Sequence, residues 1–206
     1  MRMAHMVLAL GALASAPALA AAGPLQINEF VAGPSRDWDG SGAVSTRDDE
    51  WVEVRNAGPT PLDVGRFFLS DGDSVPRYAF SGVIAPGDHY VVFGSESFAW
   101  EHAHGWPAFG LSLSNSGDQV LLWQVVGSDT VLVDGYTYRS HEGASDRAVG
   151  RLNDDGGWQL YDGLNPYTGT TPPQGNHCDP TPGTLNLCGA TVTRPVTWGR
   201  VKTLYR

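Results

Sequence analysis

The residues between Asp37 and Asp48 place oxygen-bearing groups at the spacing of a calcium-binding loop of the EF-hand type. The loop positions one, three, five, six, seven, eight, nine and twelve are filled by Asp37, Asp39, Ser41, Gly42, Ala43, Val44, Ser45 and Asp48. Calcium takes six to eight oxygens at about 2.3–2.6 Å, so alternate residues of a tight turn must point inward. We therefore predict a calcium site whose ligands are Asp37, Asp39, Ser41, the Ala43 carbonyl, Ser45, Asp48 and Asp49.

The last ligand position departs from the usual pattern. A bidentate Glu normally fills the twelfth position of such a loop, whereas Asp48 stands there in this sequence, with Asp49 and Glu50 beside it as substitutes. The alternative interpretation is a solvated acidic loop in which the Asp-Gly and Ser-Gly pairs form turns.

The segments on either side of the loop are predicted to be strands rather than helices. Residues Leu25–Val31 form a short first strand in which Phe30 breaks the alternation. After the loop, Glu50–Asn56 alternates, with Val52 and Val54 on one face and Trp51, Glu53 and Arg55 on the other. The loop is therefore expected to join two strands.

The rest of the chain predicts further short strands separated by Gly, Pro and Asp turns. One segment, Ser95–Gly105, has a weak helical pattern. The clearest predicted hairpin pairs Phe109–Ser114 with Gln119–Trp123, and Val131–Tyr138 follows as a strand in which Gly135 marks a bulge. Short strands without a sustained 3.6-residue period are typical of a β-sandwich.

Length and composition indicate one domain with a tail at each end. The chain has 206 residues, is 41% hydrophobic, and contains 26 Gly and 14 Pro. Residues 1–20 have the features of a secretory signal peptide: a positive start, a short apolar run and an Ala-Leu-Ala cleavage box. Removing them leaves 12 basic against 22 acidic residues, a net charge of −10. Such a surface argues against a nucleic-acid partner and suits divalent cations.

The two cysteines, Cys178 and Cys188, are expected to form a disulfide, because export allows oxidation. Closing a loop of this length stabilises a domain by roughly 2–3 kcal/mol. Two free thiols or a metal-binding pair are the alternatives, and neither a second Cys pair nor a nearby His pair supports a metal site.

The sequence contains no catalytic signature. A Gly-x-Ser-x-Gly motif and a Gly-rich phosphate loop are both missing, and we predict a protein that is not an enzyme. A zinc site is a weaker alternative, because His102 and His104 lie two residues apart. Its further candidate ligands are His89, His141 and His177.

Several sequence blocks follow one another in a characteristic order: Ile27–Phe30, Asp49–Asn56, Leu62–Asp71, Ile84–Gly87, Phe109–Leu122, Val133–Tyr138, Ser145–Arg151, Trp158 and Thr181–Asn186. Together, in this order, they resemble the lamin-tail domain, including its exported bacterial type. The resemblance implies an all-β, immunoglobulin-like β-sandwich over residues 21–188, used as a binding or attachment module without catalytic residues. It also implies an acidic insertion between the first two strands, where residues 37–48 lie, which strengthens the expectation of bound calcium.

The resulting expectation is a secreted or cell-surface module stabilised by calcium, with an unknown extracellular partner. The alternative is an accessory domain or metal-dependent hydrolase or nuclease that uses the acidic loop as its metal site. Residues 189–206 carry Arg194, Arg200, Lys202 and Arg206 without an acid. We predict that they form an amphipathic tail that contacts the envelope or a sorting machine; packing on the chain's own domain is the alternative.

Overall fold

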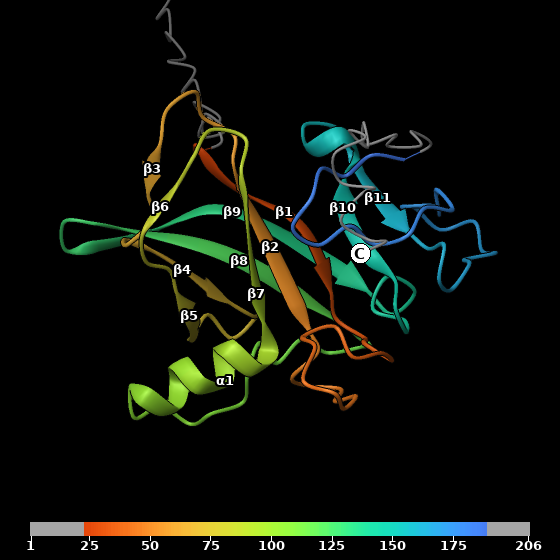
Figure 1. Cartoon of the computed structure of the whole chain (residues 1–206), viewed down its shortest axis with the longest axis horizontal. Coiled ribbons are helices and arrows are strands. Elements are labelled where there is room, and N and C mark those ends of the chain that lie inside the picture. Colours follow the sequence, from red (N-terminus) through yellow and green to blue (C-terminus); the bar gives the residue numbers. More distant parts are fainter. Residues whose placement is uncertain (1–22, 189–206) are drawn as a thin grey trace, which may run out of the picture.

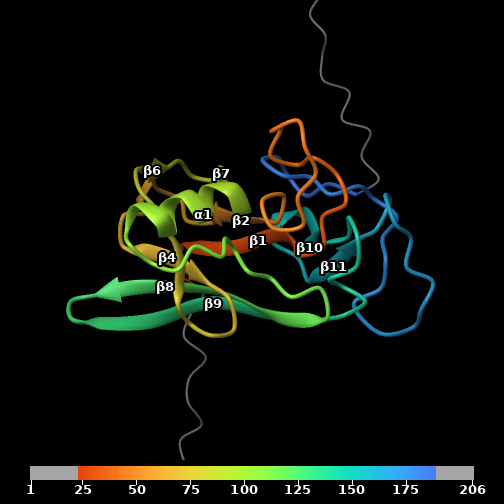
Figure 2. The same ribbon diagram turned by 90° about the horizontal axis from the view of Figure 1, so that it is seen from below.

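The fold consists of two antiparallel sheets in a sandwich, with one short helix at an edge (Figures 1 and 2). The computed structural model describes residues 23–188; the predicted signal peptide and the predicted C-terminal tail lie outside the described residues. A five-stranded sheet has the order β11-β10-β1-β2-β7, and a four-stranded sheet has the order β5-β4-β8-β9. This arrangement confirms the predicted β-sandwich.

The strands of the five-stranded sheet are β1 (Leu25–Val31), β2 (Trp51–Asn56), β7 (His89–Phe93), β10 (Ala148–Arg151) and β11 (Trp158–Tyr161). Those of the four-stranded sheet are β4 (Phe67–Ser70), β5 (Pro76–Ala79), β8 (Gly117–Val126) and β9 (Asp129–Arg139). A small arm pairs β3 (Leu62–Asp63) with β6 (Val83–Ile84). The helix α1 spans Gly94–Ala103, and the 3-10 turn η1 spans Leu152–Asp154.

The main core lies between the two sheets and is built from alternate residues of each strand. It includes Leu25, Ile27, Val52, Val54, Leu69, Val120 and Leu122, all nearly inaccessible to solvent. The broken alternation in β1 has a structural cause, because the register with β2 shifts between Ile27 and Glu29. This bulge at Asn28 returns Phe30 to the core.

The second face of β2, which carries Trp51 and Glu53, is also buried. Trp51 packs in a separate cluster with Val31, Ala148 and Tyr161, and Glu53 is fully inaccessible. The last described part of the chain, residues 176–188, runs over this face of the five-stranded sheet, on the side opposite to β8 and β9 (Figure 2). Strand alternation alone does not reveal such a cover, because it comes from residues more than a hundred positions away.

The predicted hairpin between Phe109–Ser114 and Gln119–Trp123 is wrong. Residues 109–114 form no strand, and β8 pairs instead with β9 around a turn at Gly127. Buried carboxylates, not a neighbouring strand, bind the backbone of this segment: Glu101 accepts the N–H groups of Phe109 and Gly110, and Glu50 accepts that of Leu113 at 3.2 Å. Leu111 and Leu113 still face the core, which explains the strand-like alternation, whereas Phe109 is exposed.

Two other predicted elements agree with the structure more closely. The weak helical pattern over Ser95–Gly105 corresponds to α1, whose residues cover β5. The irregularity predicted in the strand at Gly135 occurs two residues earlier, because the β8–β9 register skips Val133 between Leu132 and Asp134.

Candidate metal centre

The acidic loop joins β1 to β2 and is fixed at its C-terminal end by Asp49, a fully buried residue. One oxygen of Asp49, Oδ1, accepts the backbone N–H groups of Trp38 at 2.6 Å and Asp39 at 3.0 Å. The other, Oδ2, accepts the N–H of Ser45 at 2.7 Å. The Asp49 carboxylate thus draws both arms of the loop together, two residues before the start of β2.

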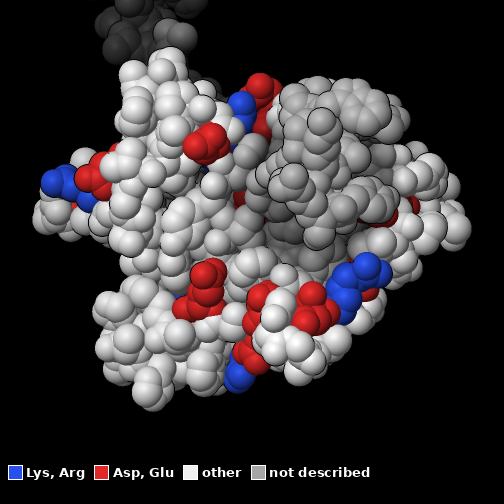
Figure 3. Space-filling model, viewed as in Figure 1, with Lys and Arg blue, Asp and Glu red and all other residues white. Residues whose placement is uncertain are grey.

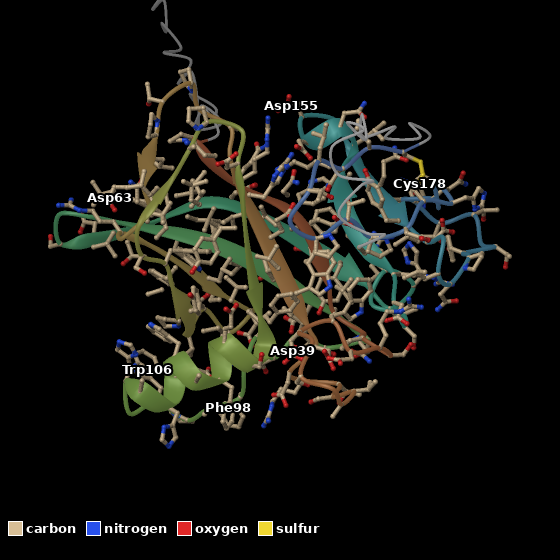
Figure 4. The ribbon with its side chains drawn as sticks, viewed as in Figure 1. Asp39, Asp63, Phe98, Trp106, Asp155 and Cys178 are labelled. Atoms are coloured by element: carbon tan, nitrogen blue, oxygen red, sulfur yellow. A yellow bond between two sulfur atoms is a disulfide. The ribbon has the colours of Figure 1, made fainter. Side chains whose placement is uncertain are left out.

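Three carboxylates meet inside this loop. One oxygen from each of Asp37, Asp39 and Asp49 lies within 4.8 Å of the other two. Figure 3 shows acidic side chains gathered over this loop, and Figure 4 shows Asp39 beside the start of α1. Such a set of hard oxygen donors suits Ca²⁺ or Mg²⁺ better than a soft metal.

The carboxylates of Asp37 and Asp39 keep acceptor capacity for a cation. Asp37 Oδ2 accepts the N–H of Gly42 at 2.8 Å, and Asp39 Oδ1 accepts that of Ser41 at 2.9 Å. No N–H donates to the second oxygen of either group within residues 23–188. The sharp turn requires Gly42, whose φ of +88° lies in the left-handed region that favours glycine. The donor set therefore fits a divalent ion.

The electrostatics of Asp39 also favour an ionised site. Partial desolvation raises the pKa of Asp39, but hydrogen bonds from Ser41 and Ser95 outweigh it, and the net pKa lies below its ordinary value. A carboxyl group that stays ionised in the free protein binds a cation without first releasing a proton.

Among the predicted acidic ligands, Asp48 is not one of these three groups. Asp48 forms an ion pair with Arg47 at 2.8 Å, and this contact lowers the pKa of Asp48. Ser41 Oγ donates to the Ala43 carbonyl at 3.1 Å, and Ser45 Oγ accepts the N–H of Asp48 at 3.1 Å. Asp48, at the twelfth position of the pattern, thus faces Arg47. Asp49, at the thirteenth position, lies close to Asp37 and Asp39 instead.

A second carboxylate, Asp146, anchors the N-terminal arm of the loop and was missed by the sequence reasoning. It accepts the N–H and the hydroxyl of Ser35, and the indole Nε1–H of Trp38 at 3.0 Å. The Trp38 ring in turn packs edge-on against Trp51, with 5.9 Å between centroids. The available signal was Asp146 itself, which lies in one of the blocks quoted for the family resemblance.

The structure contains another group of acids on the outer face of the five-stranded sheet, under residues 176–188. We call residues 176–188 the C-terminal strap. Glu29 of β1, Glu53 of β2 and Asp154 of η1 are all fully buried there. Their carboxyl groups accept the N–H groups of three strap residues, Thr181, Gly183 and Asn186 respectively.

The strap is also closed covalently. The predicted disulfide Cys178–Cys188 is present, with its Cα atoms 5.6 Å apart, and it encloses all three strap residues that contact the acids. Figure 4 shows the disulfide near the labelled Cys178, away from the acidic loop. The two groups of carboxylates therefore occupy separate parts of the fold.

The histidines considered for zinc are scattered. The ring centroids of His104 and Trp100 stack 4.4 Å apart next to the C-terminal end of α1, whereas His89, at the start of β7, pairs with Asp154 at 2.9 Å. Among the His, Cys, Asp and Glu side chains of residues 23–188, one group of three is close enough to share a metal ion, and it consists of Asp37, Asp39 and Asp49.

Comparison with protein families agrees with this architecture. Residues 18–140, more than half of the chain, match the family model described as Lamin Tail Domain. The chain belongs to the lamin tail domain family. The matched range contains β1 to β9 and the acidic loop; β10, β11 and the strap lie beyond it, although they complete the same fold.

No curated protein and no solved structure shows a significant match to this chain. Among the helices of the described residues, none combines the length and apolar character needed to cross a membrane.

Proposed function

We propose that this lamin tail domain is an exported, non-enzymatic binding or attachment module whose acidic loop is held rigid by a calcium ion. The observation that carries the proposal is the convergence of Asp37, Asp39 and Asp49 within 4.8 Å. The disulfide Cys178–Cys188 supports export, because such bonds persist in oxidising compartments.

The proposed ion has a structural role. Asp49 lies two residues before β2, and its hydrogen bonds fix the backbone at Trp38, Asp39 and Ser45. A cation bound by Asp37 and Asp39 across from Asp49 would offset the repulsion among three nearby carboxylates. The ion thus stabilises one end of the sandwich, and the loops there are where a surface partner would bind.

Calcium removal tests this proposal. An ion held at ten times its dissociation constant adds about 1.4 kcal/mol to the free energy of unfolding. We expect EDTA to lower the melting temperature of the mature protein by several degrees, and added calcium to restore it. The double variant Asp37→Asn, Asp39→Asn should melt at one temperature with or without calcium.

Asp129→Asn is the matched control, because Asp129 is an exposed acid beside the β8–β9 turn, which lies on the opposite side of the fold from the acidic loop (Figure 1). This variant should keep the full response to EDTA. An identical melting curve for the wild-type protein in EDTA and in calcium would remove the ion from the proposed function. Calcium-dependent hydrolysis of a phosphodiester or glycan by the wild-type protein, lost in the double variant, would instead favour the hydrolase alternative.

A further inference from the structure

The contacts of the Thr181 hydroxyl group, between the C-terminal strap and the sheet, require one hydrogen more than this hydroxyl group can supply. Thr181 Oγ1 lies 2.8 Å from Glu29 Oε2 and 2.9 Å from Asn186 Oδ1. A hydroxyl group has a single hydrogen, so it can donate to only one of these two oxygens. The other contact needs a hydrogen from its own partner.

The orientation of the Asn186 amide decides which contact that is. Asn186 Nδ2 lies 3.0 Å from the Arg151 carbonyl and 3.3 Å from the Asn28 carbonyl, and both are acceptors. The NH₂ group must therefore occupy this end, and Oδ1, an acceptor only, faces Thr181. The Thr181 hydroxyl consequently donates to Asn186, and the hydrogen between Thr181 and Glu29 belongs to Glu29.

The surroundings of Glu29 agree with a protonated carboxyl group. Glu53 and Asp154 lie on the same face. Burial, followed by repulsion from Glu53, raises the pKa of Glu29 well above its ordinary value, although the hydrogen bonds with Thr181 act in the opposite direction. The cations in this region are directed elsewhere: Arg55 and His89 contact Asp154 at 3.4 and 2.9 Å, and Arg151 pairs with Asp134. The remaining titratable neighbour, Tyr161, donates its hydroxyl to the Asn186 carbonyl.

We propose that the C-terminal strap is a pH-sensitive latch, closed on the sheet when Glu29 is protonated and released when Glu29 gives up that proton. Loss of the proton turns the contact between Thr181 Oγ1 and Glu29 Oε2 into a contact between two acceptors. The Thr181 hydroxyl can then turn toward Glu29 only by leaving Asn186 Oδ1 unpaired in a buried site. Release frees the strap from Thr181 onward, while the disulfide keeps it a closed loop.

Backbone hydrogen exchange of the mature, disulfide-bonded protein tests the latch. When opening is linked to loss of one proton, the protection of the Thr181, Gly183 and Asn186 amides should fall by up to about tenfold per pH unit as the pH rises from the ordinary Glu pKa of 4.5 to the raised pKa of Glu29, and should level off above it. Protection must be corrected for the intrinsic pH dependence of exchange and compared with the amides of β8. Glu29→Gln keeps a neutral side chain with a donor for Thr181, so its strap protection should not change with pH.

Glu53→Gln is the matched control, because it removes a neighbouring acid and leaves the contact between Thr181 and Glu29. This variant should retain a pH-dependent strap, with the transition moved to lower pH because repulsion from Glu53 is lost. An equally steep loss of strap protection in Glu29→Gln would overturn the proposal, and so would constant protection in the wild-type protein up to pH 10.

A second measurement keeps the proposal falsifiable if Glu29→Gln does not fold. Carbon-13 NMR of wild-type protein with labelled Glu side chains follows the ionisation of each carboxyl group directly. We expect the Glu29 carboxyl group to titrate at a pH well above the ordinary range for Glu. The chemical shifts of Thr181 and Asn186 should change over the same pH interval. If every Glu carboxyl were ionised at pH 6, the latch would be excluded.

Discussion

The acidic loop and the sheet face beneath the strap both gather three carboxyl groups, yet they differ in what can neutralise them. In the loop, Asp37 and Asp39 are at least partly open to solvent, and each keeps an oxygen that no N–H occupies. Under the strap, both oxygens of Glu53 accept hydrogen bonds, from Asn28 and Gly183, in a site closed to water. Carboxylates that solvent can reach suit a cation, whereas carboxyl groups sealed under a segment of chain favour a proton.

Burial also separates the energetic roles of the two regions. Charges near the surface interact weakly through water, so Asp37 and Asp39 destabilise the fold little when no ion is bound. A buried polar group that loses its partner costs about 1–3 kcal/mol. Substitutions under the strap should therefore have larger effects on folding than substitutions in the loop.

The largest effect is expected for Asn186→Ala. The Asn186 side chain donates to the Asn28 and Arg151 carbonyls and accepts from Thr181, and the residue is fully buried. We expect the free energy of unfolding, measured in urea, to fall by about 2–4 kcal/mol. Leu185→Ala, at a neighbouring strap position that is 44% exposed, should cost less than about 1 kcal/mol. An equal loss of unfolding free energy in both variants would contradict a special role of the buried hydrogen bonds of Asn186.

The next effect is a pH dependence that Glu53→Gln should reduce. Burial raises the pKa of Glu53 to about 7 from an ordinary value of 4.5. Between these values the folded chain holds a proton that the unfolded chain releases, so the free energy of unfolding decreases as the pH rises from 4.5 and levels off above about 7. The wild-type protein should lose about 2–3 kcal/mol more than Glu53→Gln across this range in urea titrations. Parallel curves for the two proteins would be evidence against a buried, protonated Glu53.

A moderate effect is expected for Asp146→Asn. This substitution tests whether Asp146 holds the acidic loop in a conformation that is ready to bind a cation. The substitution weakens the bonds from Ser35, Arg36 and Trp38 while preserving the size of the side chain. We expect a loss of stability of about 1–2 kcal/mol, together with weaker calcium binding measured by isothermal titration calorimetry. Unchanged calcium affinity would show that Asp37, Asp39 and Asp49 converge without this anchor.

The smallest effect is expected for Asp48→Asn. Asp48 faces Arg47 rather than the three clustered acids, so its exposed ion pair should contribute less than about 1 kcal/mol. Calcium affinity should change by less than about threefold, whereas Asp49→Asn should reduce it strongly. A large loss of affinity in Asp48→Asn would restore the twelfth residue of the pattern as a ligand.

The sequence predicted the sandwich, the position of the loop and the disulfide, because each depends on local signals. Strand alternation located β1, β2 and β7, and the Asp and Gly spacing located the loop. It could not choose between Asp48 and Asp49 as the last acid, since this choice depends on whether Arg47 turns toward one of them. The EF-hand pattern describes a loop between two helices. In this chain a strand follows the loop, and the acid that joins Asp37 and Asp39 lies one residue later than the pattern predicts.

The strap and its acids could not be predicted from the pattern of β1 and β2. Glu29 and Glu53 stand where an alternating strand would present polar residues to water, and only the later Thr181–Asn186 segment covers them. The false hairpin at Phe109–Ser114 has the same origin, because buried Glu101 and Glu50 supply its hydrogen-bond acceptors. In each case a distant acid binds backbone N–H groups that local reasoning assigns to strands or solvent.

The acidic loop is proposed to bind a cation, whereas the buried carboxyl groups under the strap are proposed to hold a proton. The most direct test is a calcium titration of the mature protein followed by nitrogen-15 NMR of the backbone amides at pH 6. We predict chemical-shift changes concentrated at residues 37–50 and their contacts with Asp146, with the amides of Thr181, Gly183 and Asn186 unmoved. Shifts centred on the strap, or no shifts at millimolar calcium, would contradict the account.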